Sequence, residues 1–420
     1  MMTLLVIFVM LVFCYSLISG KLGGTVITAP ILFTVVGMAA FVAFPRTAIG
    51  VQRVGPFLLI AELGLVLLLF TDACRTNLTI LRSIRQLPAR LLSVGMLFTI
   101  LLGAICARLV FSQFSIWEAG ILAAILAPTD AGLGQIIVTS PRVPLSVRQA
   151  LNVEAGLNDG LSVPFMLFFI ALAGTATLGT RASLTGFIVE ELGYGMLVAL
   201  GIGLPAGWLL NRASRRGWMS EPLQQMGVIA LPLLCVLASE AVGASMFIAA
   251  FVAGLAVQVA FKDAGRHASE FTEESGQLLV LAVFFLFGIA VARDWGDFTW
   301  NLVLYAVLSL TVVRMLPVAV ALLGTRLSRA TVLFMGWFGP RGLASIVLGV
   351  MFLEQYTRLP GESTIRLAVM VTALLSIFLH GLSALPGIDL YARSVARLTP
   401  DASEHRGDEP RRSARPGSGL

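Results

Sequence analysis

The segments Ala127-Pro128-Thr129-Asp130-Ala131-Gly132 and Gly339-Pro340-Arg341-Gly342 interrupt two otherwise apolar stretches of the sequence. Each places a proline, a glycine and one charge in the middle of a stretch long enough to cross a membrane as a helix. Proline removes a backbone donor and clashes with the preceding turn, so each helix is expected to break there. At membrane depth, a broken helix is tolerated only where protein or a polar cavity satisfies the freed backbone groups. Two unrelated proline kinks are the simpler alternative, but the opposite charges of Asp130 and Arg341 favour a common polar site.

The composition excludes a water-soluble protein. Of the 420 residues, 57% are hydrophobic and 12% are charged, with a mean hydropathy of +0.91. Soluble domains carry about 25% charged residues. A cytosolic enzyme, a disordered chain and a secreted disulfide domain are therefore excluded, and the four cysteines have neither disulfide nor metal-ligand spacing. The net charge of +6 comes from scattered basic residues and does not indicate nucleic-acid binding.

The apolar stretches predict an all-α polytopic membrane protein. A spanning helix needs about 20 mainly apolar residues, and about thirteen stretches satisfy that length. They cover residues 2–20, 25–44, 56–73, 89–111, 115–138, 146–174, 190–210, 223–241, 244–261, 273–292, 298–322, 329–353 and 365–390. We expect a membrane domain over residues 1–392 and a disordered cytoplasmic tail over 393–420, which is rich in Arg, Asp, Glu, Ser, Pro and Gly. The sequence has no phosphate-binding loop, so we expect no nucleotide and no cofactor, and uphill transport would need an ion gradient.

The basic residues predict the orientation. With the N-terminus outside, about 20 Lys and Arg lie on the inner side and about 6 on the outer side. This predicts a cell membrane protein with a cytoplasmic C-terminus. The two interrupted spans are then seven spans apart and enter the membrane from opposite sides, as inverted repeats require. Paired interruptions of this kind indicate the binding site of a transporter.

The sixth span carries an acidic cluster. Glu154 and Asn158 are four residues apart and share a helix face, and Asp159 lies about 100° further round. Carboxylates within a membrane span are costly and are functional by default. The cluster is therefore expected to have a functional role.

These motifs resemble the monovalent cation:proton antiporter superfamily, and within it the bacterial type of the sodium/proton exchanger branch. The likeness depends on Pro128-Thr129-Asp130 followed by Glu154, Leu157, Asn158 and Asp159 at their spacing, and it runs from about the second span to the last. Further similar segments are 69–73, 247–254, 284–288, 339–342 and 380–381. The resemblance implies the fold of that family, with inverted repeats and two unwound crossing helices, and it also implies a homodimer and a role in pH homeostasis.

The resemblance implies roles for the polar residues. Asp159 would be the main ligand of both the cation and the proton, and Asp130 with Thr129 would complete the site. Asn158 would hold the crossover of the two broken helices. The resemblance also implies that Glu154 forms an ion pair with Arg341, and that Arg314 offsets the dipoles of the half-helices.

Two positions depart from the family pattern. Many relatives have a serine where Ala155 stands, and many have a glutamate at the position of Thr71, where this chain has its acid at Asp72. Both departures leave the coordination shell, and with it the choice among Na⁺, Li⁺ and K⁺, open.

The chemistry predicts exchange by competition. Alkali cations prefer carboxylate, carbonyl and hydroxyl oxygens, and a carboxylate in lipid holds either a proton or a cation. Asn158 is neutral, so a single titrating carboxylate, Asp159, predicts an electroneutral cycle. The alternatives are an ion-coupled solute symporter with a similar core, a channel, and an intramembrane aspartyl protease. The last would make the protein an enzyme, and Asp159 lacks the glycine- and tyrosine-flanked context of such proteases.

Overall fold

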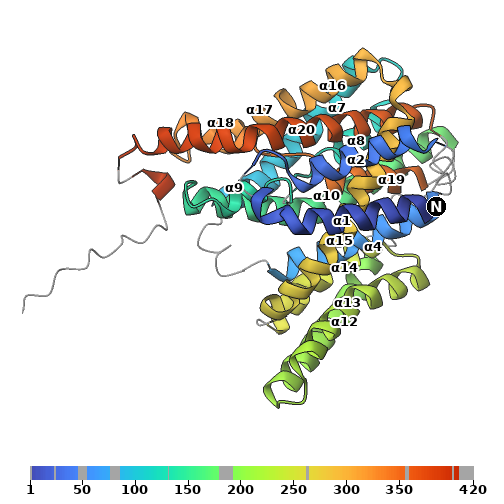
Figure 1. Ribbon diagram of the computed structural model, residues 1–420, viewed down its shortest axis with the longest axis vertical. Helices are drawn as coiled ribbons and strands as arrows, with labels where there is room; N and C mark the ends of the chain where they lie inside the picture. Colours follow the sequence, from blue (N-terminus) through green and yellow to red (C-terminus); the bar gives the residue numbers. More distant parts are fainter. Residues whose placement is uncertain are drawn as a thin grey trace, which may run out of the picture.

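The computed structural model describes residues 2–22, 25–45, 54–75, 86–130, 132–178, 193–261, 264–354, 359–399 and 402–405. Over these residues, all regular secondary structure is helical. Within these ranges, eight helices are long and apolar enough to cross a membrane, and four shorter apolar helices accompany them. The all-α membrane fold predicted from the sequence is confirmed (Figure 1).

A helix or an interrupted pair of helices lies at each expected span. The first four spans correspond to α1 (Met2–Leu22), α2 (Ala29–Ala43), α4 (Val54–Arg75), and a continuous run of α6 (Gln86–Arg90), the π-helical turn η2 (Leu91–Gly95) and α7 (Met96–Val110). The next six are α8 (Ile116–Ile125) with α9 (Gln135–Thr139), α10 (Leu145–Leu178), α12 (Gly195–Arg215), α13 (Glu221–Val242), α14 (Met246–Ala260) and α15 (Ala264–Arg293). The last three are α16 (Trp300–Leu310) with α17 (Val312–Ala321), α18 (Arg329–Trp337) with α19 (Leu343–Glu354), and α20 (Glu362–Val395), and two short 3₁₀ turns are η4 (Trp295–Asp297) and η5 (Ser403–His405).

The helices form two groups that meet at α4 and α10. In the scaffold group, α2 and α4 contact α15, α4 contacts α14, and α12 and α13 contact α14. In the crossover group, α8 contacts α7 and α10, and α20 contacts α16, α18 and α19. Figure 1 shows α12 and α13 side by side, projecting from the rest of the molecule. Contacts of α4 with α10 and α19 join the groups, so the acidic span lies at their boundary.

Glycines set the closest helix approach within the scaffold group. A Cβ atom at Gly37 of α2 would overlap the carbonyl oxygen of Phe285, and one at Gly288 of α15 would overlap that of Thr34. The two backbones therefore touch, as small residues permit between membrane helices.

Both predicted helix breaks are confirmed. Between α8 and α9, residues 126–130 and 132–134 leave the α-helical path, and between α18 and α19, residues 338–342 do so. A third break, which the sequence pattern did not predict, separates α16 from α17 at Thr311 (φ −107°, ψ −86°). Pro317 lies six residues further on, inside α17, where it removes a backbone donor. The expected eleventh span is therefore two helices, and the second of them carries Arg314.

The described residues after the last span are the end of α20, which continues to Val395, and a short turn, η5. The turn η5 is anchored by Glu404, whose side chain accepts hydrogen bonds from Ser328 N (2.7 Å) and Thr331 Oγ1 (2.8 Å). Ser146 Oγ donates to the Glu404 carbonyl oxygen at 2.7 Å. Residues 402–405 therefore connect the starts of α18 and α10, while residues 406–420 lie outside the described part of the chain.

Candidate functional site

The two broken helices cross at Asp130. Its backbone N–H donates to the Pro340 carbonyl oxygen at 2.8 Å, which joins one break to the other. Its carboxylate accepts three backbone hydrogen bonds: Oδ1 from Gly132 (2.7 Å) and Leu133 (3.1 Å), and Oδ2 from Leu343 (2.5 Å). Leu343 is the first residue of α19, so the negative charge lies at the positive end of that half-helix. Four backbone N–H groups at the two breaks are thus satisfied by oxygens of the protein.

Glycine is required for this crossing. A Cβ atom at Gly342 would overlap Asp130 Oδ2 and approach Leu133 Cδ1 to 2.6 Å. A Cβ atom at Gly339 would overlap Arg314 Nε. The glycines on either side of Pro340-Arg341 therefore leave room for a carboxylate at one position and a guanidinium at the other.

Arg341 neutralises the opposite helix end. Its side chain is fully buried, and Nη1 donates to the carbonyl oxygens of Ala127 and of Pro128, the latter at 2.8 Å. These carbonyls follow the C-terminal end of α8, where the helix dipole is negative. Arg341 N donates to Ser376 Oγ at 2.6 Å. His380 of α20 contacts Ser376 and, through Nε2, the Trp337 carbonyl oxygen at 2.9 Å. Ser376 had not been identified from the sequence, because a lone serine in an apolar helix gives no pattern.

The expected ion pair between Glu154 and Arg341 is wrong: Glu154 pairs with Arg314. Arg314 Nη1 and Nη2 donate to Glu154 Oε1 and Oε2 at 2.5 and 2.9 Å, and both side chains are about 5% exposed or less. Such two-pronged pairs are the strong form of the arginine–carboxylate interaction. The physical reason is that Arg341 is engaged by the α8 carbonyls. The third helix break and the absence of a side chain at Gly339 let Arg314 reach α10 instead.

Asn158 ties α10 to the first break. Its Nδ2 donates to Thr129 Oγ1 at 2.8 Å, and both side chains are buried. Among the described residues, the Thr129 carbonyl oxygen accepts no hydrogen bond. One break therefore presents an unused backbone oxygen beside the acidic span.

Asp159 is the acid of the cluster with the fewest hydrogen-bond partners. The residue is 4% exposed, and its Oδ1 is buried without a hydrogen-bond partner in the described part of the chain. The negative charges of Asp130 and Asp72 act on it. Asp72 belongs to α4, and its Cβ would lie 3.6 Å from a Cβ at Gly156. Asp159 therefore lies where the two helix groups meet, in a region of negative charge that attracts cations.

A small cavity lies beside the crossover. Its volume is about 20 Å³, and Thr129, Asp130, Ala155 and Pro340 are among the residues that line it. A cavity needs about 10–15 Å³ to hold a water molecule. There is thus room for about one water molecule next to Ala155, the position without the hydroxyl that many relatives are expected to have.

Comparisons with known proteins identify a matching family and a solved structure of similar fold. The family described as "Sodium/hydrogen exchanger, transmembrane" matches residues 6–386. The structure of the sodium proton antiporter MjNhaP1 from Methanocaldococcus jannaschii aligns with a TM-score of 0.73 and 18% identity, over 93% of this chain and 99% of that chain. At this identity, the likeness shows a common fold.

Curated relatives include a Na⁺/H⁺ antiporter of Schizosaccharomyces pombe, 25% identical over 61% of this chain and 58% of the relative. A K⁺/H⁺ antiporter NhaP2 of Shewanella sp. (strain MR-4) is 25% identical over 77% of this chain and 56% of the relative. The chain thus spans little more than half the length of these relatives. Because the family match covers nearly all of the helices around the crossover, the chain belongs to the sodium/hydrogen exchanger family.

Proposed function

We propose that the protein is a secondary active antiporter that exchanges a monovalent alkali cation, most readily Na⁺, for H⁺. The observation that carries this proposal is the buried, unpartnered carboxylate oxygen of Asp159 beside the crossing of two broken helices. The family match and the curated antiporter relatives support it. Na⁺ and K⁺ both occur in the names of those relatives, and a Bacillus subtilis relative, 28% identical over 45% of this chain and 28% of its own length, is named for sodium, potassium, lithium and rubidium.

The cation ligands would be the Asp159 carboxylate and the Thr129 carbonyl oxygen. Both are oxygen ligands of the kind that alkali cations prefer. Asp130 would contribute chiefly its negative charge, because its carboxylate already accepts three backbone hydrogen bonds. Asn158 would fix Thr129 in place through its 2.8 Å hydrogen bond.

The absent serine would be replaced by water. The cavity of about 20 Å³ beside Ala155 opens toward Thr129 and Asp130, which would provide the water with polar partners. A water ligand binds a cation more loosely than a fixed hydroxyl does, since it must be ordered on binding. We therefore expect Ala155 to lower the cation affinity and to relax the choice among Na⁺, Li⁺ and K⁺.

Exchange would follow from competition at Asp159. A proton and a cation cannot occupy the same carboxylate oxygens at once, and an empty charged carboxylate is costly to carry through the membrane. The crossover group would move against the scaffold group and expose the site to each side in turn, as inverted-repeat transporters do. Because Asn158 is neutral, one carboxylate carries one charge each way, and the cycle would be electroneutral.

The proposal also includes the membrane location, the orientation and the oligomeric state of the protein. The excess of basic residues on one side favours a cell membrane location with the N-terminus outside and the C-terminus cytoplasmic. The resemblance to the family favours a homodimer.

The test is proton flux in sealed vesicles that contain the purified full chain. A pH-sensitive dye inside the vesicles reports flux when Na⁺, Li⁺ or K⁺ is added outside. We expect a cation-dependent signal with the unmodified protein and none with Asp159→Asn. The matched control is Asp389→Asn, which removes an exposed acid paired with Arg142 at the surface and should leave the flux unchanged.

Two outcomes would contradict the proposal. Cation-dependent flux in Asp159→Asn would remove that residue from the site. If a protein that is folded, as shown by its thermal unfolding transition, gives no flux with any alkali cation, an ion-coupled solute symporter is favoured. A voltage-sensitive rate would contradict only the electroneutral stoichiometry.

A further inference from the structure

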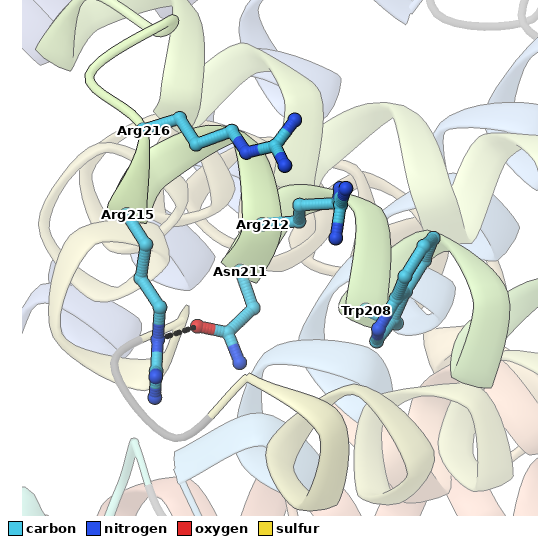
Figure 2. Close-up of a pocket in the computed structure, with 5 residues that line it drawn as sticks. All are labelled: Trp208, Asn211, Arg212, Arg215 and Arg216. Atoms are coloured by element: carbon cyan, nitrogen blue, oxygen red, sulfur yellow. Dashed lines mark hydrogen bonds between the residues drawn. The ribbon is translucent and has the colours of Figure 1, made fainter.

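The C-terminal end of α12, in the scaffold group, carries a basic cavity that shares no lining residue with the cavity at the crossover. Its volume is about 330 Å³, and it is lined by one aromatic, one amide and three arginine side chains (Figure 2). The residues are Trp208, Asn211, Arg212, Arg215 and Arg216. This cavity does not belong to the cation site, because guanidinium groups repel cations.

Three contacts hold the arginine side chains in place. Arg215 Nε donates to Asn211 Oδ1 at 2.9 Å, as Figure 2 shows, and Asn211 Nδ2 donates to the Ala260 carbonyl oxygen of α14 at 3.0 Å. The guanidinium of Arg212 lies 5.4 Å from the ring centre of Trp208. That of Arg216 lies 4.8 Å from the ring of Trp218. Stacking and hydrogen bonding lower the conformational freedom that binding a ligand would otherwise have to remove.

The cavity carries an uncompensated positive charge. Within the part of the chain that the structure describes, no carboxylate forms an ion pair with Arg212, Arg215 or Arg216. The C-terminal dipole of α12 offsets only about half a charge. The cavity therefore attracts an anion, and the planar guanidinium groups match the oxygen geometry of a phosphate.

An apolar stripe leads along α12 to this cavity. Leu197, Leu200, Leu204 and Trp208 follow each other at helical spacing and are 66, 39, 42 and 54% exposed. An adjacent face of α12, with Gly203 and Gly207, packs closely on α14 and does not cover the stripe. The stripe is thus left to the hydrocarbon of the bilayer and ends at a tryptophan, the residue typical of the membrane–water boundary.

From this juxtaposition we propose that the cavity binds the phosphate headgroup of an anionic phospholipid, whose acyl chains lie along the apolar stripe of α12. The arginines supply the charge and the guanidinium forks, Trp208 marks the level of the headgroup, and the leucines contact the chains. A soluble phosphate would use the arginines alone. The stripe therefore favours a lipid as the source of the phosphate.

The test counts bound lipids on the purified, delipidated full chain by native mass spectrometry. Phosphatidylglycerol and phosphatidylcholine are titrated onto the unmodified protein and onto the variant Arg212→Gln/Arg215→Gln/Arg216→Gln. We expect one tightly held phosphatidylglycerol on the unmodified protein, and an affinity that falls about fivefold for each arginine removed. The matched control, Arg393→Gln/Arg397→Gln, removes exposed basic residues near the end of α20 and should keep the tight lipid.

Further arms identify the source of the phosphate. Inorganic phosphate and glycerol 3-phosphate at millimolar concentration should not displace the lipid, and Leu200→Ser/Leu204→Ser should weaken lipid binding without changing any binding of those soluble ions. Displacement by the soluble ions would overturn the assignment to a lipid. So would an equal loss in the control variant, or equal affinity for phosphatidylcholine. If the triple variant does not fold, Arg215→Gln and Asn211→Ala each test the same site with an expected change of about fivefold.

Discussion

Arg314 of α17 and Glu154 of α10 form a two-pronged ion pair, with distances of 2.5 and 2.9 Å, in the protein interior. The pair joins the third helix break to the acidic span four residues before Asn158. Because both side chains are about 5% exposed or less, neither charge has water as an alternative partner. The pair therefore fixes the position of α10 relative to the crossover.

Removing one partner of the Glu154–Arg314 pair should destabilise the protein far more than removing both. We expect Glu154→Gln to lower the free energy of unfolding by about 3–5 kcal/mol, because it leaves the Arg314 charge buried and unpaired. The double variant Glu154→Gln/Arg314→Met should recover most of that loss. Thermal unfolding in detergent, arranged as a double-mutant cycle, measures the coupling. Additive losses from the two substitutions would show that the pair does not form.

The crossover should not tolerate a side chain at residue 342. In Gly342→Ala, the new methyl group overlaps Asp130 Oδ2, so the bond from Leu343 N to that oxygen must lengthen or break. We expect about 1–3 kcal/mol of destabilisation and at least a tenfold lower cation-driven proton flux in vesicles. The matched control is Gly201→Ala, since a Cβ at Gly201 has no atom within 4 Å. Equal behaviour of the two variants would contradict the close approach at the crossover.

A hydroxyl at residue 155 should tighten cation binding. In Ala155→Ser, the added oxygen has room in the cavity of about 20 Å³ and takes the place proposed for water. A fixed hydroxyl ligand should lower the KM for Na⁺ by about threefold to tenfold, and should separate the KM values of Na⁺ and K⁺ more widely. Flux titrations with each cation at constant pH measure both effects. Unchanged KM values for both cations would place the cavity outside the cation path.

The attachment of residues 402–405 should depend on pH. Burial raises the pKa of Glu404, but the hydrogen bonds from Ser328 N–H and Thr331 Oγ1 lower it more, and the net pKa lies below the ordinary value of 4.5. A depressed pKa in the folded state stabilises the attachment above pH 4.5 and loses that contribution as the pH falls through the lowered value. We therefore expect the contact to persist at neutral pH and to open in acid.

Hydrogen exchange of the peptide that contains Ser328 measures this attachment. The Ser328 amide should be protected at pH 7 and should lose protection, after correction for the intrinsic exchange rate, as the pH falls through the lowered pKa of Glu404. In Glu404→Gln, protection should already be low at pH 7 and should not change with pH. Asp389→Asn is the control, and a pH-dependent loss that persists in Glu404→Gln would assign the effect to another group.

The helices and the two expected breaks could be predicted because their causes are local. An apolar run of about 20 residues crosses a bilayer as a helix, since lipid offers the backbone no hydrogen-bond partner. Pro128 and Pro340 remove donors from their own helices regardless of what surrounds them. The break at Thr311 could not be predicted, because the nearby Pro317 can equally well remain inside an intact kinked helix.

The partners of the charged groups depended on the arrangement of the helices. Arg314 and Arg341 are chemically equivalent choices for Glu154, and nothing in their spacing along the chain favours one. In the folded protein, the carbonyls at the end of α8 engage Arg341, and the space beside Gly339 admits Arg314. Likewise, Glu404 contacts the start of α18, which lies more than 70 residues earlier in the chain. Only the path of α20 brings these two segments together. Membrane helices and their interruptions follow from the desolvation of each segment's own backbone, whereas ion pairs between segments follow from three-dimensional distances that no local pattern encodes.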